Sequence, residues 1–99
     1  MKKRKQKLTL TPRDRIRCFL EAYYPDDVDK ILLADGFDEA FMGAIVRDGY
    51  PVAVYGKTKC IMQLMRKNKW TSEEAEEYFS FNVEGAYVGD YTPIYMEEL

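Results

Sequence analysis

The 99-residue chain contains no histidine and only two cysteines. Without histidine it cannot form the usual Ser-His-Asp or Cys-His catalytic arrangements, and it has no histidine to bind a metal. It has no run of about twenty apolar residues, so we expect no membrane-spanning helix. The basic stretch Met1–Lys7 is not followed by the apolar segment of a secretory signal, and we therefore expect a cytoplasmic protein.

Metal and cofactor motifs are also missing. Cys18 and Cys60 are too few for a disulfide scaffold and fall on apolar faces of expected helices, so we expect two buried free thiols. The acidic group Asp26–Asp29 lacks the spacing and the glycine of a calcium loop. The tripeptide 56–58, Gly-Lys-Thr, matches only the end of a phosphate-binding loop. The sequence therefore predicts no catalytic residue, no metal and no cofactor, and a protein that is not an enzyme.

The chain does contain an uneven distribution of charge. Residues 1–17 carry eight basic and one acidic side chain, whereas the other 82 carry seven basic and sixteen acidic ones. A basic segment of this kind can bind a phosphate backbone with salt-dependent and sequence-independent affinity; it can also solubilise the chain or dock on an acidic surface. We predict a flexible basic arm over residues 1–10 and one globular domain over residues 11–99. The candidate nucleic-acid contacts are Lys2, Lys3, Arg4, Lys5, Lys7, Arg13, Arg15 and Arg17.

Capping residues and apolar spacing predict four helices. Thr11, Pro12 and Asp14 form a helix start signal, and apolar residues then recur at intervals of three and four. Thr71 and Glu74 have the spacing of a second capping box. The expected helices cover residues 12–23, about 26–34, 57–67 and 72 to about 81.

Residues 37–55 permit two interpretations. Phe41–Arg47 and Tyr50–Tyr55 can pair as a β-hairpin, because the intervening Asp-Gly dipeptide favours a two-residue turn. A helix over residues 39–48 is the alternative. We favour the hairpin, in which the second strand is the safer assignment.

The last expected strand is Thr92–Met96, at the edge of the sheet because Pro93 has no N–H to donate. The elements together predict an α+β domain with about four helices packed on a small antiparallel sheet of two or three strands. An open sheet edge permits a homodimer as well as a monomer.

Tyrosines recur every four residues in the glycine-containing tail of the chain. Exposed tyrosines supply rigid contact area at a low cost in side-chain entropy, which favours protein binding. The alternative is that they fill the core around irregular turns. The candidate partner-binding residues are Tyr87, Asp90, Tyr91 and Tyr95.

Several segments between residues 36 and 96 resemble small proteins of tailed bacteriophages and prophages. The most specific is Phe-Asn-x-x-Gly-Ala-Tyr-Val-Gly, which is Phe81–Gly89 here. That group has no established activity, so the resemblance implies a setting and not a mechanism. It implies a non-catalytic accessory protein in the host cytoplasm, a binding module that modulates a host protein such as a defence or transcription component. The alternative is a nucleic-acid-associated protein that binds through the basic arm.

Overall fold

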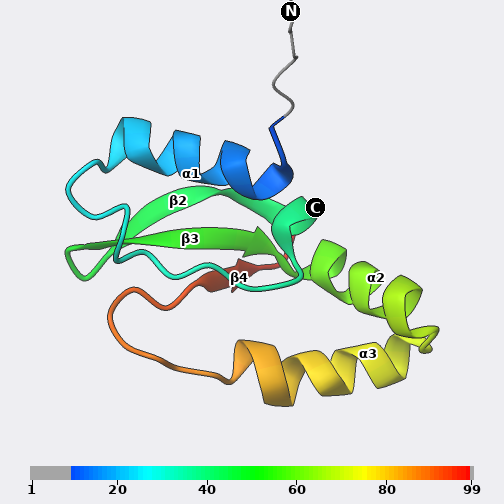
Figure 1. Ribbon diagram of the computed structural model, residues 1–99. Helices are drawn as coiled ribbons and strands as arrows, with labels where there is room; N and C mark the ends of the chain where they lie inside the picture. Colours follow the sequence, from blue (N-terminus) through cyan, green and yellow to red (C-terminus); the bar gives the residue numbers. More distant parts are fainter. Residues whose placement is uncertain (1–9, 99) are drawn as a thin grey trace, which may run out of the picture.

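The computed structural model describes residues 10–98 (Figure 1). Within these residues the chain has an α+β fold, with three α-helices and one three-stranded mixed sheet in the order β2-β3-β4. The elements, in chain order, are α1 (Pro12–Tyr23), a 3₁₀ turn (Asp38–Ala40), β2 (Phe41–Arg47), β3 (Tyr50–Gly56), α2 (Lys57–Asn68), α3 (Ser72–Phe79), a π-helical turn (Ser80–Glu84) and β4 (Ile94–Met96).

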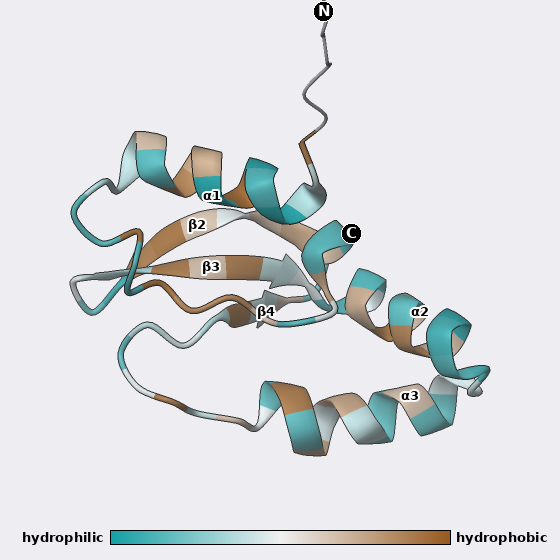
Figure 2. Ribbon diagram, in the orientation of Figure 1, coloured by the Kyte–Doolittle hydropathy of each residue, from teal (hydrophilic) through white to brown (hydrophobic). Residues whose placement is uncertain are grey.

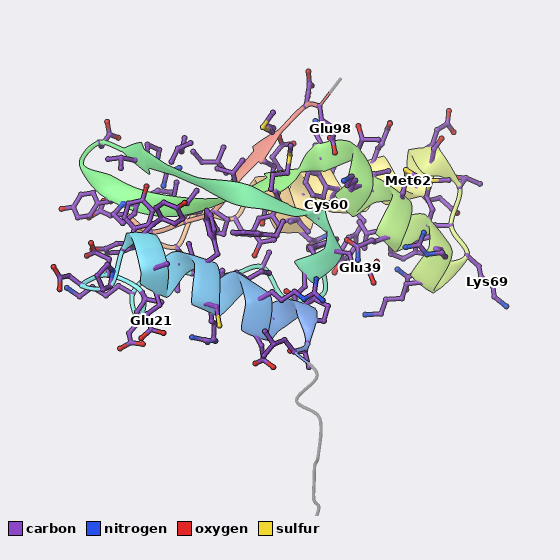
Figure 3. The ribbon with its side chains drawn as sticks, turned by 90° about the horizontal axis from the view of Figure 1, so that it is seen from above. Glu21, Glu39, Cys60, Met62, Lys69 and Glu98 are labelled. Carbon is purple, nitrogen blue, oxygen red and sulfur yellow. The ribbon has the colours of Figure 1, made fainter. Side chains whose placement is uncertain are left out.

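Helix α1 begins as its sequence predicts. The Thr11 side chain accepts a hydrogen bond from the backbone N–H of Asp14, and the Asp14 carboxylate accepts one from the N–H of Thr11. The helix lies along one face of the sheet, where Ile16 and Leu20 are buried (Figures 1 and 3). The regularly spaced apolar residues Ile16 and Leu20 of this helix therefore pack in the core.

The hairpin β2–β3 is confirmed, and the alternative helix over residues 39–48 is wrong. Asp48 and Gly49 both have positive φ, 54° and 88°, as a type I′ turn requires. Pro51 lies opposite Val46. Antiparallel ladders alternate between hydrogen-bonded and non-hydrogen-bonded pairs, and the pair next to the one that flanks the turn is not hydrogen-bonded. The backbone groups of Pro51 therefore point away from β2, and its missing N–H costs no hydrogen bond to that strand.

Strand β4 pairs with β3 in parallel, so the predicted all-antiparallel sheet is wrong. Helix α2 continues directly from β3, and α3 packs back against it; the segment 85–93 then returns the chain along the length of β3 (Figure 1). The two helices and this return segment form the long crossover that a parallel pair needs. The edge position expected for the last strand is confirmed.

The predicted helix over residues 26–34 is absent. Successive turns replace it, with the N–H of Ile31 donating to the carbonyl oxygen of Asp27 over 3.1 Å. Further along, the N–H of Ala34 donates to the hydroxyl of Tyr55, 2.9 Å away on β3. The segment thus keeps one helix-like bond at Ile31, but the Ala34 N–H finds its partner on β3 and no regular helix forms.

The core lies between the sheet, α1 and the α2–α3 pair, and Figure 2 shows hydrophobic residues along β2 and β3. Tyr55 and Phe79 are its largest fully buried side chains. Cys60 is buried as expected, but Cys18 is exposed, so the prediction of two buried thiols is wrong for Cys18. The sequence prediction places Cys18 on the apolar face of this helix, but it lies two positions from both Ile16 and Leu20, the two residues of α1 that are buried, and so faces away from the core.

Helices α2 and α3 follow their predicted positions. Thr71 and Glu74 form the expected reciprocal capping box, and the Trp70 ring packs on Tyr78 with centroids 5.2 Å apart. The α-helix ends at Phe79 and continues as the π-helical turn. In the part of the chain that the structure describes, no helix has the length and apolar character needed to cross a membrane.

Candidate functional site

The segment Gly85–Thr92, here called the tail loop, is organised by one buried threonine. Thr92 is 7% exposed. Its hydroxyl accepts a hydrogen bond from the N–H of Val88 over 2.9 Å and donates to the carbonyl oxygen of Gly89 over 2.6 Å. Its own N–H donates to the same carbonyl over 3.2 Å. Gly89 has φ of 118°, a conformation that other residues rarely adopt.

Two residues from distant segments hold the tail loop against the rest of the domain. The guanidinium of Arg47, at the end of β2, donates to the carbonyl oxygens of Asp90 and Thr92 over 3.3 and 3.1 Å. The Tyr91 hydroxyl donates to Asp27 over 3.0 Å. Partial burial and the Asp27 carboxylate raise the pKa of Tyr91. The loop therefore has a defined shape although it contains no regular secondary structure.

The structure separates the four candidate partner-binding residues. Tyr95 belongs to the core: its ring stacks on Tyr55 with centroids 5.7 Å apart, and burial raises its pKa. Tyr91 is half-buried and anchors the loop. Tyr87 and Asp90 are exposed, Tyr87 to 71%. Only this last pair is exposed to solvent.

A groove with both apolar and polar walls lies on one side of the tail loop and encloses about 730 Å³. Its walls are the segment 32–39, the second half of α2, the end of α3 with its π-helical turn, and the loop itself. Phe37, Leu64 and Tyr95 contribute buried or half-buried apolar surface to its lining. Gln63 also lines the groove, and its Oε1 is buried with no hydrogen-bond partner among the described residues.

A second, smaller hollow, here called the turn notch, adjoins the tail loop and encloses about 250 Å³. It is lined by residues of the β2–β3 turn and of the tail loop: Arg47, Asp48, Tyr50, Tyr87 and Asp90. The exposed pair from the tail thus meets the hairpin turn, about 40 residues away in the sequence. The tail loop has a groove on one side and the notch on another.

The candidate nucleic-acid contacts have mixed outcomes. Lys2, Lys3, Arg4, Lys5 and Lys7 lie outside the described residues, as does almost all of the predicted arm over residues 1–10. Arg13 is committed to the fold: its Nε and Nη2 bond to the Asp38 carboxylate over 2.9–3.1 Å, which raises the pKa of Arg13. Arg15 and Arg17 are exposed on α1.

The Gly-Lys-Thr tripeptide at the start of α2 faces a carboxylate of the same chain. Glu98 accepts a hydrogen bond from the N–H of Thr58 over 2.8 Å, and Figure 3 shows it beside the start of the helix. Burial opposes the ionisation of Glu98, but backbone N–H groups of Thr58 and Lys59 outweigh this effect and lower its pKa. The start of α2, where a phosphate would bind, is therefore occupied by the carboxylate of Glu98.

Sequence reasoning missed the residues that assemble these surfaces. Thr92 and Arg47 act through contacts with the tail loop, and no local pattern marks either residue. Gln63 lies beside an apolar helical stripe and gave no signal of its own. The described residues contain no group of three or more Cys, Asp or Glu placed to hold a metal ion. No protein-family model, curated protein or solved structure matches the chain.

Proposed function

We propose that the chain is a non-catalytic binding module, an accessory protein of a phage or prophage, that engages a host protein through the tail loop and the groove beside it. The observation that carries the proposal is the exposure of Tyr87 and Val88, 71% and 64%, on a loop that Thr92 and Arg47 hold in place. Exposed apolar side chains contribute nothing to the core, and holding them rigid lowers the entropic cost of binding.

The groove supports the same proposal. Its size is within the range of ligand sites. Its lining combines apolar side chains such as Phe37 and Val88 with charged and amide side chains such as Glu39, Arg66 and Asn82, so it can take a ligand that has both apolar and polar groups. Val88 lines the groove from the tail loop, so this exposed apolar residue is continuous with the groove, whereas its neighbour Tyr87 lines the turn notch. We infer that the partner places one or more apolar side chains there.

Capture from a host lysate tests the proposal. Val88→Glu puts a charge at the groove, and we expect it to abolish recovery of one stoichiometric host protein without changing the unfolding midpoint. Val46→Glu is the matched control, because Val46 is also exposed, to 57%, and does not line the groove. Tyr87→Ala should weaken capture as well. Equal capture by all three variants and the parent chain contradicts the proposal.

The second candidate is a nucleic-acid-associated protein, favoured by the exposure of Arg15 and Arg17 on the helix that follows the basic segment. Deleting residues 1–10 should then abolish binding to a DNA duplex at moderate salt, measured by fluorescence anisotropy. Retained binding would remove the role of that segment.

A further inference from the structure

The turn notch has a fixed geometry, because both segments that form it are held. Asp48 and Gly49 occupy the left-handed conformations of a type I′ turn. The tail loop is tied to the end of the same hairpin by the hydrogen bonds from Arg47 to two loop carbonyls. The notch is thus present before any ligand arrives, and a ligand need not order it.

Its charge is unbalanced. Two carboxylates, Asp48 and Asp90, line the notch, and neither takes part in an ion pair or a side-chain hydrogen bond within residues 10–98. The one cation in the lining, Arg47, donates to backbone carbonyl oxygens and to no carboxylate. The notch therefore has an excess of negative charge and two carboxylates free to accept hydrogen bonds.

Its aromatic residues favour the same kind of ligand. Tyr50 and Tyr87 line the notch and are 37% and 71% exposed. The Tyr91 ring packs edge-on against Tyr50, with centroids 5.3 Å apart, and so fixes its position. The face of a tyrosine ring attracts a cation through its quadrupole, and carboxylates beside such rings add charge-assisted hydrogen bonds.

The size of the notch limits the ligand to a small group. The notch encloses only about 250 Å³ and is lined by five residues. A guanidinium fits this space, is planar and stacks on an aromatic ring, and its five donors can serve two carboxylates together. An ammonium lacks the flat face and the paired donors, so it fits less well.

We propose that the turn notch binds an arginine side chain of the partner protein, in contact with Tyr50 and Tyr87 and with Asp48 and Asp90 as acceptors. This inference rests on the proposed function, since it assigns a basic residue to the partner that the groove engages through apolar contacts. The partner would then place an arginine in the notch and an apolar side chain in the groove, so that these two residues lie on different sides of the tail loop.

Titration of the ¹⁵N-labelled full chain with N-acetyl-arginine amide, followed by NMR, tests the proposal without the host partner. We expect arginine to shift the NMR signals of the backbone amides in residues 48–50 and 87–90. N-acetyl-citrulline amide, the neutral isostere, should not bind, and N-acetyl-lysine amide should bind more weakly than the arginine compound. Asp48→Asn and Asp90→Asn should each weaken binding at least threefold. Asparagine tolerates the left-handed conformation of residue 48, so that variant retains the turn.

The matched control is Asp29→Asn, an exposed aspartate that does not line the notch. Equal binding of citrulline, shifts located elsewhere, or unchanged affinity in both notch variants would each overturn the inference. If those results occur while Val88→Glu still abolishes host capture, the arginine assignment fails and the proposed function stands. If arginine binds the notch but no groove variant affects capture, the proposed function fails.

Discussion

Replacing Gly56 with alanine is expected to destabilise the domain by displacing Glu98. Gly56 has φ of −82°, which alanine adopts readily, so its backbone is not strained. A Cβ at this position would lie 2.8 Å from Cδ of Glu98 and would overlap its Oε2. The sulfur of Met42 would be 3.2 Å away, but it is the flexible end of a side chain and can move. The carboxylate must therefore leave the start of α2.

The magnitude follows from the lost cap. The carboxylate accepts the N–H of Thr58 and lies at the positive end of the α2 dipole. Loss of a cap costs about 1 kcal/mol, and loss of a charge at a helix end costs ~0.3–1 kcal/mol. We expect Gly56→Ala and Glu98→Ala each to lower the free energy of unfolding by about 1–2 kcal/mol. Once one substitution has removed the cap, the other should destabilise the domain less than it does alone. The effect of the double variant should therefore be smaller than the sum of the single effects by about 1 kcal/mol.

Urea unfolding of the parent chain, both single variants and the double variant, followed by circular dichroism, measures this coupling. Glu97→Ala is the matched control, because Glu97 is a neighbouring glutamate whose side chain is 87% exposed, and it should change stability by less than about 0.5 kcal/mol. If the two substitutions add to within about 0.5 kcal/mol, the cap does not link them and the reasoning is refuted.

The cap also predicts a pH dependence. Because the folded state lowers the pKa of Glu98, its contribution is fully present above the ordinary glutamate pKa of about 4.3 and is lost as the pH falls through the lower folded value. The stability difference between the parent chain and Glu98→Gln should therefore shrink below about pH 4. A difference that grows as the pH falls would contradict the ionised cap.

Three further predictions concern the core, the tail loop and the thiols. Tyr55→Phe removes the partner of the Ala34 N–H and should cost about 1–3 kcal/mol in urea unfolding; a cost near zero would show that water replaces the hydroxyl. Thr92→Val keeps the volume but removes both hydroxyl hydrogen bonds, so amide exchange in the tail loop should accelerate while exchange in the core stays unchanged. Cys18 should react with a thiol reagent in the native state, whereas Cys60, whose pKa burial raises to about 12, should react only on unfolding.

Much of the fold could be predicted where the stabilising contacts are local in the sequence. The capping box at Thr11 closes across three residues, and the Asp48-Gly49 turn needs only its own two residues to reach positive φ. The α+β class and the positions of α2 and β3 follow from similarly short patterns. For the site, Tyr87 and Asp90 are exposed, whereas no sequence pattern distinguished them from Tyr95, which packs against the core.

The sequence by itself thus determined the helix starts, the hairpin and the absence of histidine chemistry, because each of these depends on residue types and on contacts within a few positions. The tertiary structure alone decided the turns in place of a helix at residues 26–34, the parallel pairing of β4 and the assembly of the turn notch. Their determining hydrogen bonds join Ala34 to Tyr55, Asp27 to Tyr91 and Arg47 to the tail loop. Residues so far apart in the sequence come into contact only when the whole chain has packed, and no periodicity or spacing in the sequence predicts these contacts.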